Sequence, residues 1–88
     1  CLLRYDGKWV ALSPVQARVI SVLISRFRGS VTSYDELRAA AWDTAAPSPG
    51  ALTAIIKRLR RRIRPLGLDV LTVRLRGYVL DVRRPALA

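Results

Sequence analysis

The sequence predicts one α+β domain in which a β-hairpin, three helices and a second β-hairpin follow one another. Three observations predict this order: an Asp-Gly turn between two strand-like segments near the N-terminus, three segments of helical periodicity in the middle, and strand-like alternation near the C-terminus. The chain has 88 residues, 51% of them hydrophobic, which suffices for a single modest core. We expect residues 1–88 to be a domain from the C-terminal part of a longer protein, because the chain begins with Cys1 and enters a strand directly.

The first hairpin is predicted over residues 2–12. Asp6-Gly7 is typical of a two-residue type I′ turn, in which both central residues take positive φ. Tyr5 and Trp9 flank the turn, and aromatic side chains of this kind favour strands.

The first helix is predicted to begin after Ser13. This serine is a favourable N-cap, Pro14 fits the first helical position, and Gln16 completes a capping box. Apolar side chains follow at helical spacing, namely Val15, Val19, Ile20, Leu23, Ile24 and Phe27. Residues 28–30, Arg-Gly-Ser, are expected to end this helix.

The second helix is predicted to begin after Ser33, with Glu36 as the partner in another capping box. Its core side carries Tyr34, Leu37, Ala41 and Trp42. A loop of small residues and proline is expected at 43–48.

The third helix is predicted over about residues 49–64, with Ser48-Pro49 as N-cap and first turn and Pro65 as the stop. Winding it at 100° per residue gives a narrow core-facing stripe of Leu52, Ile56, Leu59 and Ile63. Residues 70–74 and 78–82 then alternate like two strands around a turn at 75–77. A basic third helix followed by a hairpin is the layout of a winged helix-turn-helix.

The charge distribution indicates a polyanionic partner. The chain has 16 lysines and arginines against six acids, a formal net charge of +10, and residues 44–88 alone contribute ten basic and two acidic groups. Six of the eight residues from Lys57 to Arg64 are basic, with no acid between Gly50 and Arg64. A merely solvated helix face usually mixes both signs, so this pattern favours nucleic acid. No apolar run approaches the roughly 18–20 residues of a membrane span. A membrane surface is not expected as partner either, because the core uses the apolar stripe of the basic helix.

The sequence offers little for catalysis. It has no histidine, its one cysteine is at the terminus, and Asp35 and Glu36 fit the dipole at the start of a helix better than a catalytic role. We therefore expect neither an enzyme nor a cofactor or metal site, and a single cysteine fits the reducing cytoplasm. The aromatic residues with rings able to stack on bases are expected to pack in the core instead. These are Trp9, Tyr34, Trp42 and Tyr78.

From about Trp9 to Val82 the sequence resembles the winged-helix effector domain of OmpR/PhoB-type bacterial response regulators. The segments that carry the resemblance are LSPVQARVISVL, SVTSYDELRAAAW, LTAIIKRLRRRI and LTVRLRGYVL. They are similar, in this order, to the family's first helix, its second helix ending in Trp, its recognition helix with Leu-Arg-x-Lys-Ile, and its wing with Thr-Val-Arg-Gly-x-Gly-Tyr.

The resemblance implies sequence-specific binding of double-stranded DNA, with the third helix in the major groove and the wing, residues 72–78, at the minor groove. The DNA-binding residues that it implies are Thr53, Ala54, Lys57, Arg58, Arg60, Arg61, Arg64, Thr72, Arg74 and Arg76. It also implies contact with RNA polymerase through the 43–48 loop. A homodimer on repeated half-sites is expected because a small module with a single recognition helix commonly binds such sites in pairs. Leu75 stands where the family has the first glycine of the wing motif, so Arg76 is expected to share the wing contact.

One alternative remains open at this point. Winged-helix domains also occur fused to enzymes or sensors, where they act as protein-docking or regulatory modules. RNA is disfavoured as a ligand, because the sequence has no aromatic RNA-binding strand and no GXXG loop, and an A-form major groove does not admit a helix.

Overall fold

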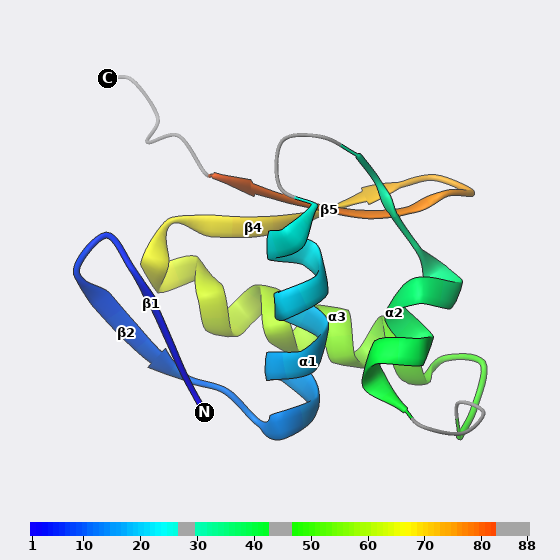
Figure 1. The fold of residues 1–88 in the computed structure, drawn as a ribbon, viewed down its shortest axis with the longest axis horizontal. Helices are drawn as coiled ribbons and strands as arrows, with labels where there is room; N and C mark the ends of the chain where they lie inside the picture. Colours follow the sequence, from blue (N-terminus) through cyan, green and yellow to red (C-terminus); the bar gives the residue numbers. More distant parts are fainter. Residues whose placement is uncertain (27–29, 43–46, 83–88) are drawn as a thin grey trace.

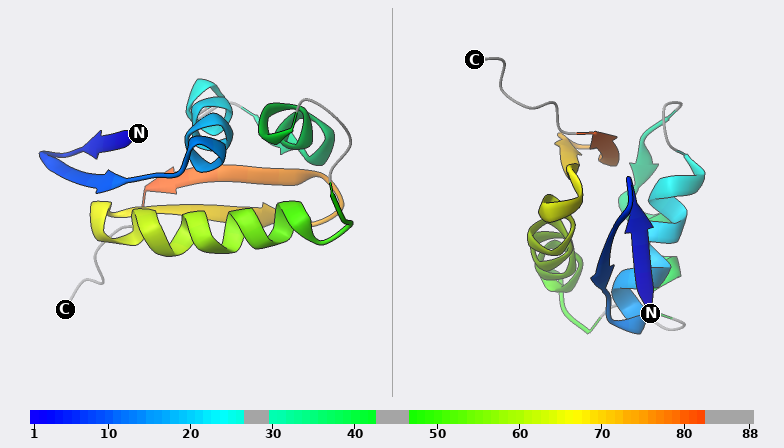
Figure 2. Two further views of the ribbon diagram at one scale, coloured as in Figure 1. Left: turned by 90° about the horizontal axis from the view of Figure 1, so that it is seen from below. Right: turned by 90° about the vertical axis from the view of Figure 1, so that its left-hand side faces the viewer.

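The computed structural model describes residues 1–26, 30–42 and 47–82. Their elements, in chain order, are β1 (Leu2–Tyr5), β2 (Lys8–Ala11), α1 (Pro14–Ser25), β3 (Thr32–Ser33), α2 (Tyr34–Ala41), α3 (Ala51–Ile63), a 3₁₀ turn η1 (Arg64–Leu66), β4 (Leu68–Val73) and β5 (Gly77–Val82). The predicted α+β winged-helix architecture is confirmed. Helices α1 and α2 lie on one side of the domain and α3 on the other; β4 and β5 run along α3 and across α1, and the β1–β2 hairpin lies at one end (Figures 1 and 2).

The N-terminal hairpin forms as predicted. Strands β1 and β2 pair antiparallel, with Tyr5 opposite Lys8, and the connecting residues Asp6 and Gly7 have φ of 51° and 77°. Positive φ at both positions is the type I′ geometry that matches the right-handed twist of the two strands.

Helix α1 has the predicted capping box. The Ser13 hydroxyl accepts from the Gln16 N–H, and the Gln16 side chain accepts from the Ser13 N–H. The helix ends at Ser25, earlier than predicted, with Arg26 as its C-cap, and Phe27 lies outside the described residues. Of the apolar residues at helical spacing, Val19, Ile20 and Leu23 are buried, whereas Ile24 is 45% exposed.

Helix α2 begins at the predicted cap but lacks the complete capping box. The Ser33 hydroxyl accepts from the Glu36 N–H, whereas the Glu36 carboxylate accepts from that hydroxyl and pairs with Arg26. Ser33 belongs at the same time to strand β3, where its register partner in β5 is Gly77. The Ser33 backbone, whose N–H would complete the capping box, is therefore part of a sheet that the sequence did not predict.

Strand β3 joins the C-terminal hairpin in a three-stranded antiparallel sheet of order β3-β5-β4. Gly77 lies directly after the hairpin turn, where Ser33 of β3 is its register partner, and has φ of 156°. A Cβ at this position would lie 1.9 Å from the carbonyl oxygen of Thr32. Glycine is required here, because any side chain would separate β3 from β5.

Helix α3 buries the predicted stripe. Leu52, Ile56, Leu59 and Ile63 are each no more than 2% exposed. They pack in one core with residues of α1, α2 and the sheet, including Val19, Leu23, Leu37, Val70 and Leu80. The predicted helix start is wrong: Gly50, not Ser48, is the N-cap, and no side chain caps the helix. The Ser48 carbonyl accepts from the Ala51 N–H, so Ser48 and Pro49 belong to the turn before the helix.

Candidate nucleic-acid interface

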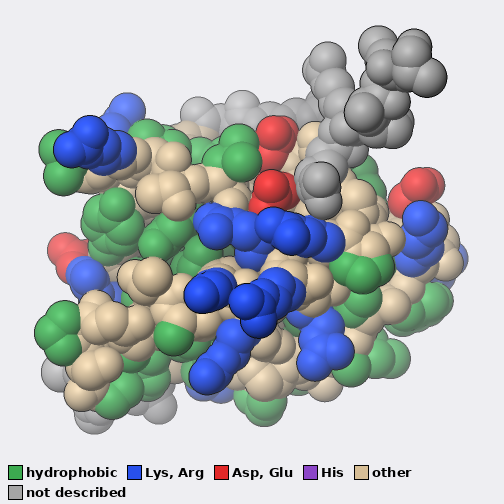
Figure 3. Space-filling model, turned by 180° about the vertical axis from the view of Figure 1, so that it is seen from behind, with side chains coloured by type: hydrophobic (Ala, Val, Ile, Leu, Met, Phe, Trp, Pro, Cys, Tyr) green, Lys and Arg blue, Asp and Glu red, His purple; other side chains and the backbone are tan. Residues whose placement is uncertain are grey.

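Basic side chains gather over the outer side of α3. Figure 3 shows lysine and arginine side chains clustered in the middle of this face of the domain. We define the basic face as Lys57, Arg58, Arg61, Arg62 and Arg64, all of which are exposed. Within the described residues none of them forms an ion pair, while Arg26, Arg38 and Arg60 each pair with an acid. The helix therefore carries repulsive charge that only an external anion can compensate.

The outer side of α3 changes character along the axis. Its N-terminal half presents small exposed side chains, Thr53 and Ala54, after the uncapped start at Gly50. The long cationic side chains begin at Lys57 and continue to the end of the helix. A helix with this distribution can bring its first two turns close to a flat or concave surface while its arginines reach outward on both sides.

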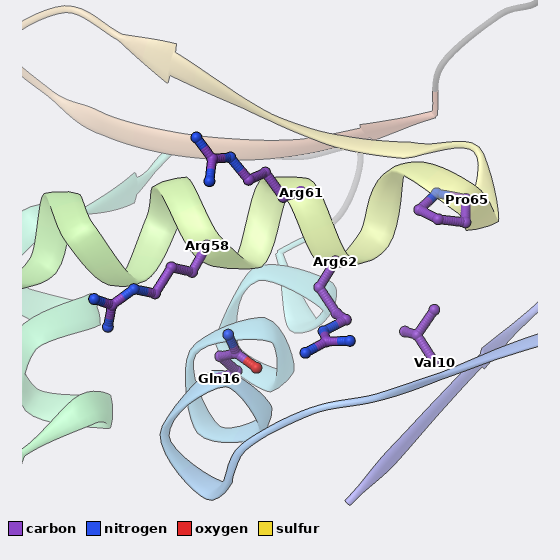
Figure 4. Close-up of a pocket in the computed structure, with 6 residues that line it drawn as sticks. All are labelled: Val10, Gln16, Arg58, Arg61, Arg62 and Pro65. Atoms are coloured by element: carbon purple, nitrogen blue, oxygen red, sulfur yellow. The ribbon is translucent and has the colours of Figure 1, made fainter.

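Three arginines of the basic face line an open hollow of about 440 Å³ together with Val10, Gln16 and Pro65. In Figure 4, Arg58 and Arg62 extend from the side of α3 that faces α1, and Arg61 extends toward the β4–β5 hairpin. Arg62 is one turn beyond Arg58, which is why both share this side. Arg62 was absent from the predicted DNA-binding residues, although the same i, i+4 spacing was available in the sequence.

Arg60 differs from the other predicted binding residues. Its Nε donates to the carbonyl oxygen of Val70 at 2.9 Å and lies 3.5 Å from Oδ1 of Asp69. Its side chain is 29% exposed. Because β4 is the edge strand of the sheet, this contact ties α3 to the sheet and covers part of the open edge. A DNA contact by Arg60 stays a prediction, but Nε of its guanidinium group is engaged within the domain.

The wing is the β4–β5 hairpin, and its tip consists of residues 74–76. Arg74, Leu75 and Arg76 are all exposed, as is Thr72 near the end of β4. The Arg76 N–H donates to the carbonyl of Val73 across the turn at 3.0 Å. Both views of the ribbon place the wing tip at the end of the domain where α3 begins (Figures 1 and 2). The start of α3 and the wing tip thus lie at the same end of the domain, and of the predicted binding residues Arg60 contacts the sheet.

The aromatic predictions are partly confirmed. Tyr78 is 6% exposed and meets Tyr34 edge to face, with 5.6 Å between ring centroids, and Trp42 packs against the core. The prediction that Trp9 packs inside is wrong, because its side chain is 56% exposed. Its ring instead lies under the guanidinium of Arg4, 5.1 Å from the centroid. In a two-stranded sheet with one face in solvent, a strand-forming aromatic need not be buried.

Other kinds of site find no support among the described residues. No group of three or more His, Cys, Asp or Glu side chains is placed to hold a metal ion in residues 1–26, 30–42 and 47–82. Over the same ranges, no helix has the length and apolar character needed to cross a bilayer. Most of the 43–48 loop, which was predicted as a polymerase contact, lies outside the described residues, with only Pro47 and Ser48 described.

Comparison with known proteins agrees with this geometry. The sequence profile of the family described as "Transcriptional regulatory protein, C terminal" matches residues 7–80. Among solved structures, the chain is similar to the C-terminal domain of the nisin resistance regulator NsrR, described as a lantibiotic response regulator. The two share 31% sequence identity with a TM-score of 0.74, over 96% of this chain and 86% of the other. No match was found among curated protein sequences.

Proposed function

The chain belongs to the family of C-terminal domains of transcriptional regulatory proteins, and from that premise we propose that it recognises a specific sequence of double-stranded DNA through α3 and the wing. The family assignment supplies the coarser statement: this is a DNA-binding winged-helix effector domain of the OmpR/PhoB type, which acts in transcription regulation. It is not a family of enzymes. The observation that carries the finer proposal is the basic face, five exposed cations without an acidic partner among the described residues.

The dimensions of α3 suit the major groove. A helix with its side chains is about 10–12 Å across, and the major groove of B-DNA is about 12 Å wide. The small side chains at Thr53 and Ala54 let the first turns approach the base edges. Arg58, one turn beyond Ala54, then reaches the bases with a planar pair of donors.

The remaining cations fit the phosphates on either side of the groove. Lys57 and Arg61, one turn apart, share one side of the helix and are assigned to the phosphates of one wall, and Arg64 extends the positive surface beyond the helix end. At the wing, Thr72 is assigned to the DNA backbone and Arg74 with Arg76 to the minor groove, where a narrow groove concentrates negative potential. A homodimer on repeated half-sites, contact with RNA polymerase through 43–48, and a cytoplasmic location complete the proposal and rest on the family likeness.

The experiment compares two variants that remove one positive charge each. Arg58→Ala lies on the basic face, whereas Arg4→Ala removes an exposed arginine from β1, outside α3 and the wing. The probe is the tightest-binding duplex selected from a random-sequence pool with the unmodified domain, and affinity is followed by fluorescence anisotropy. We expect Arg58→Ala to weaken binding about tenfold to a hundredfold, as for loss of one bidentate base contact, and Arg4→Ala to change it less than threefold.

Salt dependence separates DNA binding from the docking alternative. The logarithm of the association constant should fall linearly with the logarithm of salt concentration, and Arg61→Ala should reduce the slope by about 1. Equal affinities of Arg58→Ala and Arg4→Ala would reject the groove assignment. A binding curve that does not respond to salt between 50 and about 200 mM would favour a protein-docking role.

A further inference from the structure

An exposed leucine occupies the tip of the wing. Leu75 is 87% exposed, more than any other exposed large hydrophobic side chain of the described residues. Its backbone has φ of 65°, in the left-handed region that favours glycine and disfavours a bulky side chain. The leucine thus combines an unfavourable backbone conformation with an unfavourable solvent exposure.

Folding gives no reason for a leucine at this position. The turn is closed by the backbone hydrogen bond from Arg76 to Val73, which any residue at position 75 would allow. An isobutyl group that stays in water contributes no burial. Strained and exposed residues of this kind are often found at sites of contact with other molecules.

The neighbours of Leu75 indicate what kind of surface it meets. Arg74 and Arg76 flank it, both exposed, and no acid occurs between Val70 and Leu80. An apolar tip between two cations fits a surface that is anionic at its rim and apolar within. The minor groove of DNA has this character, because phosphates line its walls and stacked bases form its floor. A protein surface of the same pattern would need acids around an apolar pocket.

We propose that Leu75 acts as an apolar wedge that enters the minor groove and partly unstacks one base step, while Arg74 and Arg76 hold the phosphates beside it. The proposal rests on the proposed function, in which the wing reaches the minor groove. Side chains that insert in this way kink the duplex toward the major groove by about 20–90°. The wedge should therefore select a flexible pyrimidine–purine step, such as TA or CA, at the position under the wing.

The test separates the wedge from an ordinary contact. Leu75→Gly removes the side chain and relieves the left-handed strain, and Leu75→Met retains an apolar side chain of similar length. Leu71→Ala is the matched control, because Leu71 is a 44% exposed leucine in strand β4 of the same hairpin. The probe is the selected duplex described above, labelled at its ends for energy transfer to report the bend, with 2-aminopurine at its TA or CA steps to report unstacking.

We expect the unmodified domain, Leu75→Met and Leu71→Ala to bend the duplex and to raise 2-aminopurine fluorescence at one step. Leu75→Gly should lose both the bend and the fluorescence signal, and its affinity for the duplex should fall about tenfold. Its melting temperature should be at least that of the unmodified domain, because relief of the backbone strain offsets the flexibility that glycine adds to the unfolded chain. A residue that serves the fold is not expected to give a variant that binds DNA more weakly while its melting temperature is maintained or raised.

An unchanged bend with Leu75→Gly would overturn the wedge, even with some loss of affinity. The wedge would also be overturned if sedimentation showed a concentration-dependent dimer that disappears in Leu75→Gly while the bend remains. Leu75 would then contact another copy of the chain. Failure of the unmodified domain to select any duplex would instead reject the proposed function, a result that is distinct from a bound but unbent duplex.

Discussion

Replacing Arg60 with alanine tests whether this arginine serves the fold or the DNA. Its guanidinium contacts the sheet, donating to the Val70 carbonyl at 2.9 Å and lying 3.5 Å from the Asp69 carboxylate. The variant removes both contacts and leaves the edge of β4 uncovered. We therefore expect Arg60→Ala to destabilise the domain, unlike the removal of its exposed neighbours.

The size of the effect follows from these contacts. A hydrogen bond with a charged donor contributes about 1.5–3 kcal/mol, and here the lower end applies because water can reach the freed Val70 carbonyl. The ion pair adds up to about 1 kcal/mol, since both side chains are only partly shielded. Relief of repulsion from neighbouring cations returns about 0.5 kcal/mol. The net loss is about 1.5 kcal/mol, which lowers the melting temperature of a domain of this size by about 6–12 °C.

The assay pairs thermal unfolding, followed by circular dichroism, with anisotropy titration at a temperature where all variants are folded. Arg61→Ala is the matched control, as an exposed arginine one residue further along the same helix. We expect Arg60→Ala to melt lower and bind DNA within about threefold of the unmodified domain, and Arg61→Ala to melt within about 2 °C but bind more weakly. A normal melting temperature with a large loss of affinity for Arg60→Ala would refute the reasoning.

Two further predictions concern the backbone of the fold. Gly77→Ala should destabilise the domain by about 3 kcal/mol or more in urea unfolding, because the new Cβ would lie 1.9 Å from the Thr32 carbonyl oxygen. Gly67→Ala is the control: its φ is 81° and nothing lies within 4 Å of its Cβ, so it should cost about 1 kcal/mol. Similar losses for the two variants would mean that β3 can move aside. Ser13→Ala should cost about 1 kcal/mol of stability, because helix α1 loses its N-cap. Ser21→Ala removes a hydroxyl that donates to the Ala17 carbonyl within the same helix, and it should be neutral or slightly stabilising in the same measurement.

Local patterns in the sequence predicted the features that depend on neighbouring residues. The type I′ turn at Asp6-Gly7, the capping box at Ser13 and the buried stripe of α3 follow from turn chemistry, side-chain reach and helical periodicity, and the structure confirms all three. The outer side of α3 could be predicted for the same reason, because residues opposite a buried stripe must face outward. The basic face was therefore visible before the fold was known.

The features that the sequence did not reveal depend on contacts between distant segments. Strand β3 has two residues and exists because β5 offers an edge for it to pair with, and no periodicity can show in so short a segment. The engagement of Arg60 depends on β4 lying beside α3, ten residues further along the chain. Trp9 was misplaced because alternation in a strand does not reveal which face of a small sheet is covered.

The position of the acids in the second half of the domain determines where its positive potential is strongest. Residues 47–82 contain two acids, Asp69 and Asp81, which face each other as register partners at the open end of the wing hairpin. Like charges in such a pair repel, and Arg60 beside Asp69 offsets this repulsion. Arg60 is thus engaged with the sheet, and both acids lie at the opposite end of the hairpin from the wing tip. The wing tip is consequently remote from both acids, and on α3 the exposed cations outnumber the one acid beside Arg60, so that an approaching polyanion is drawn to α3 and the wing before any base is contacted.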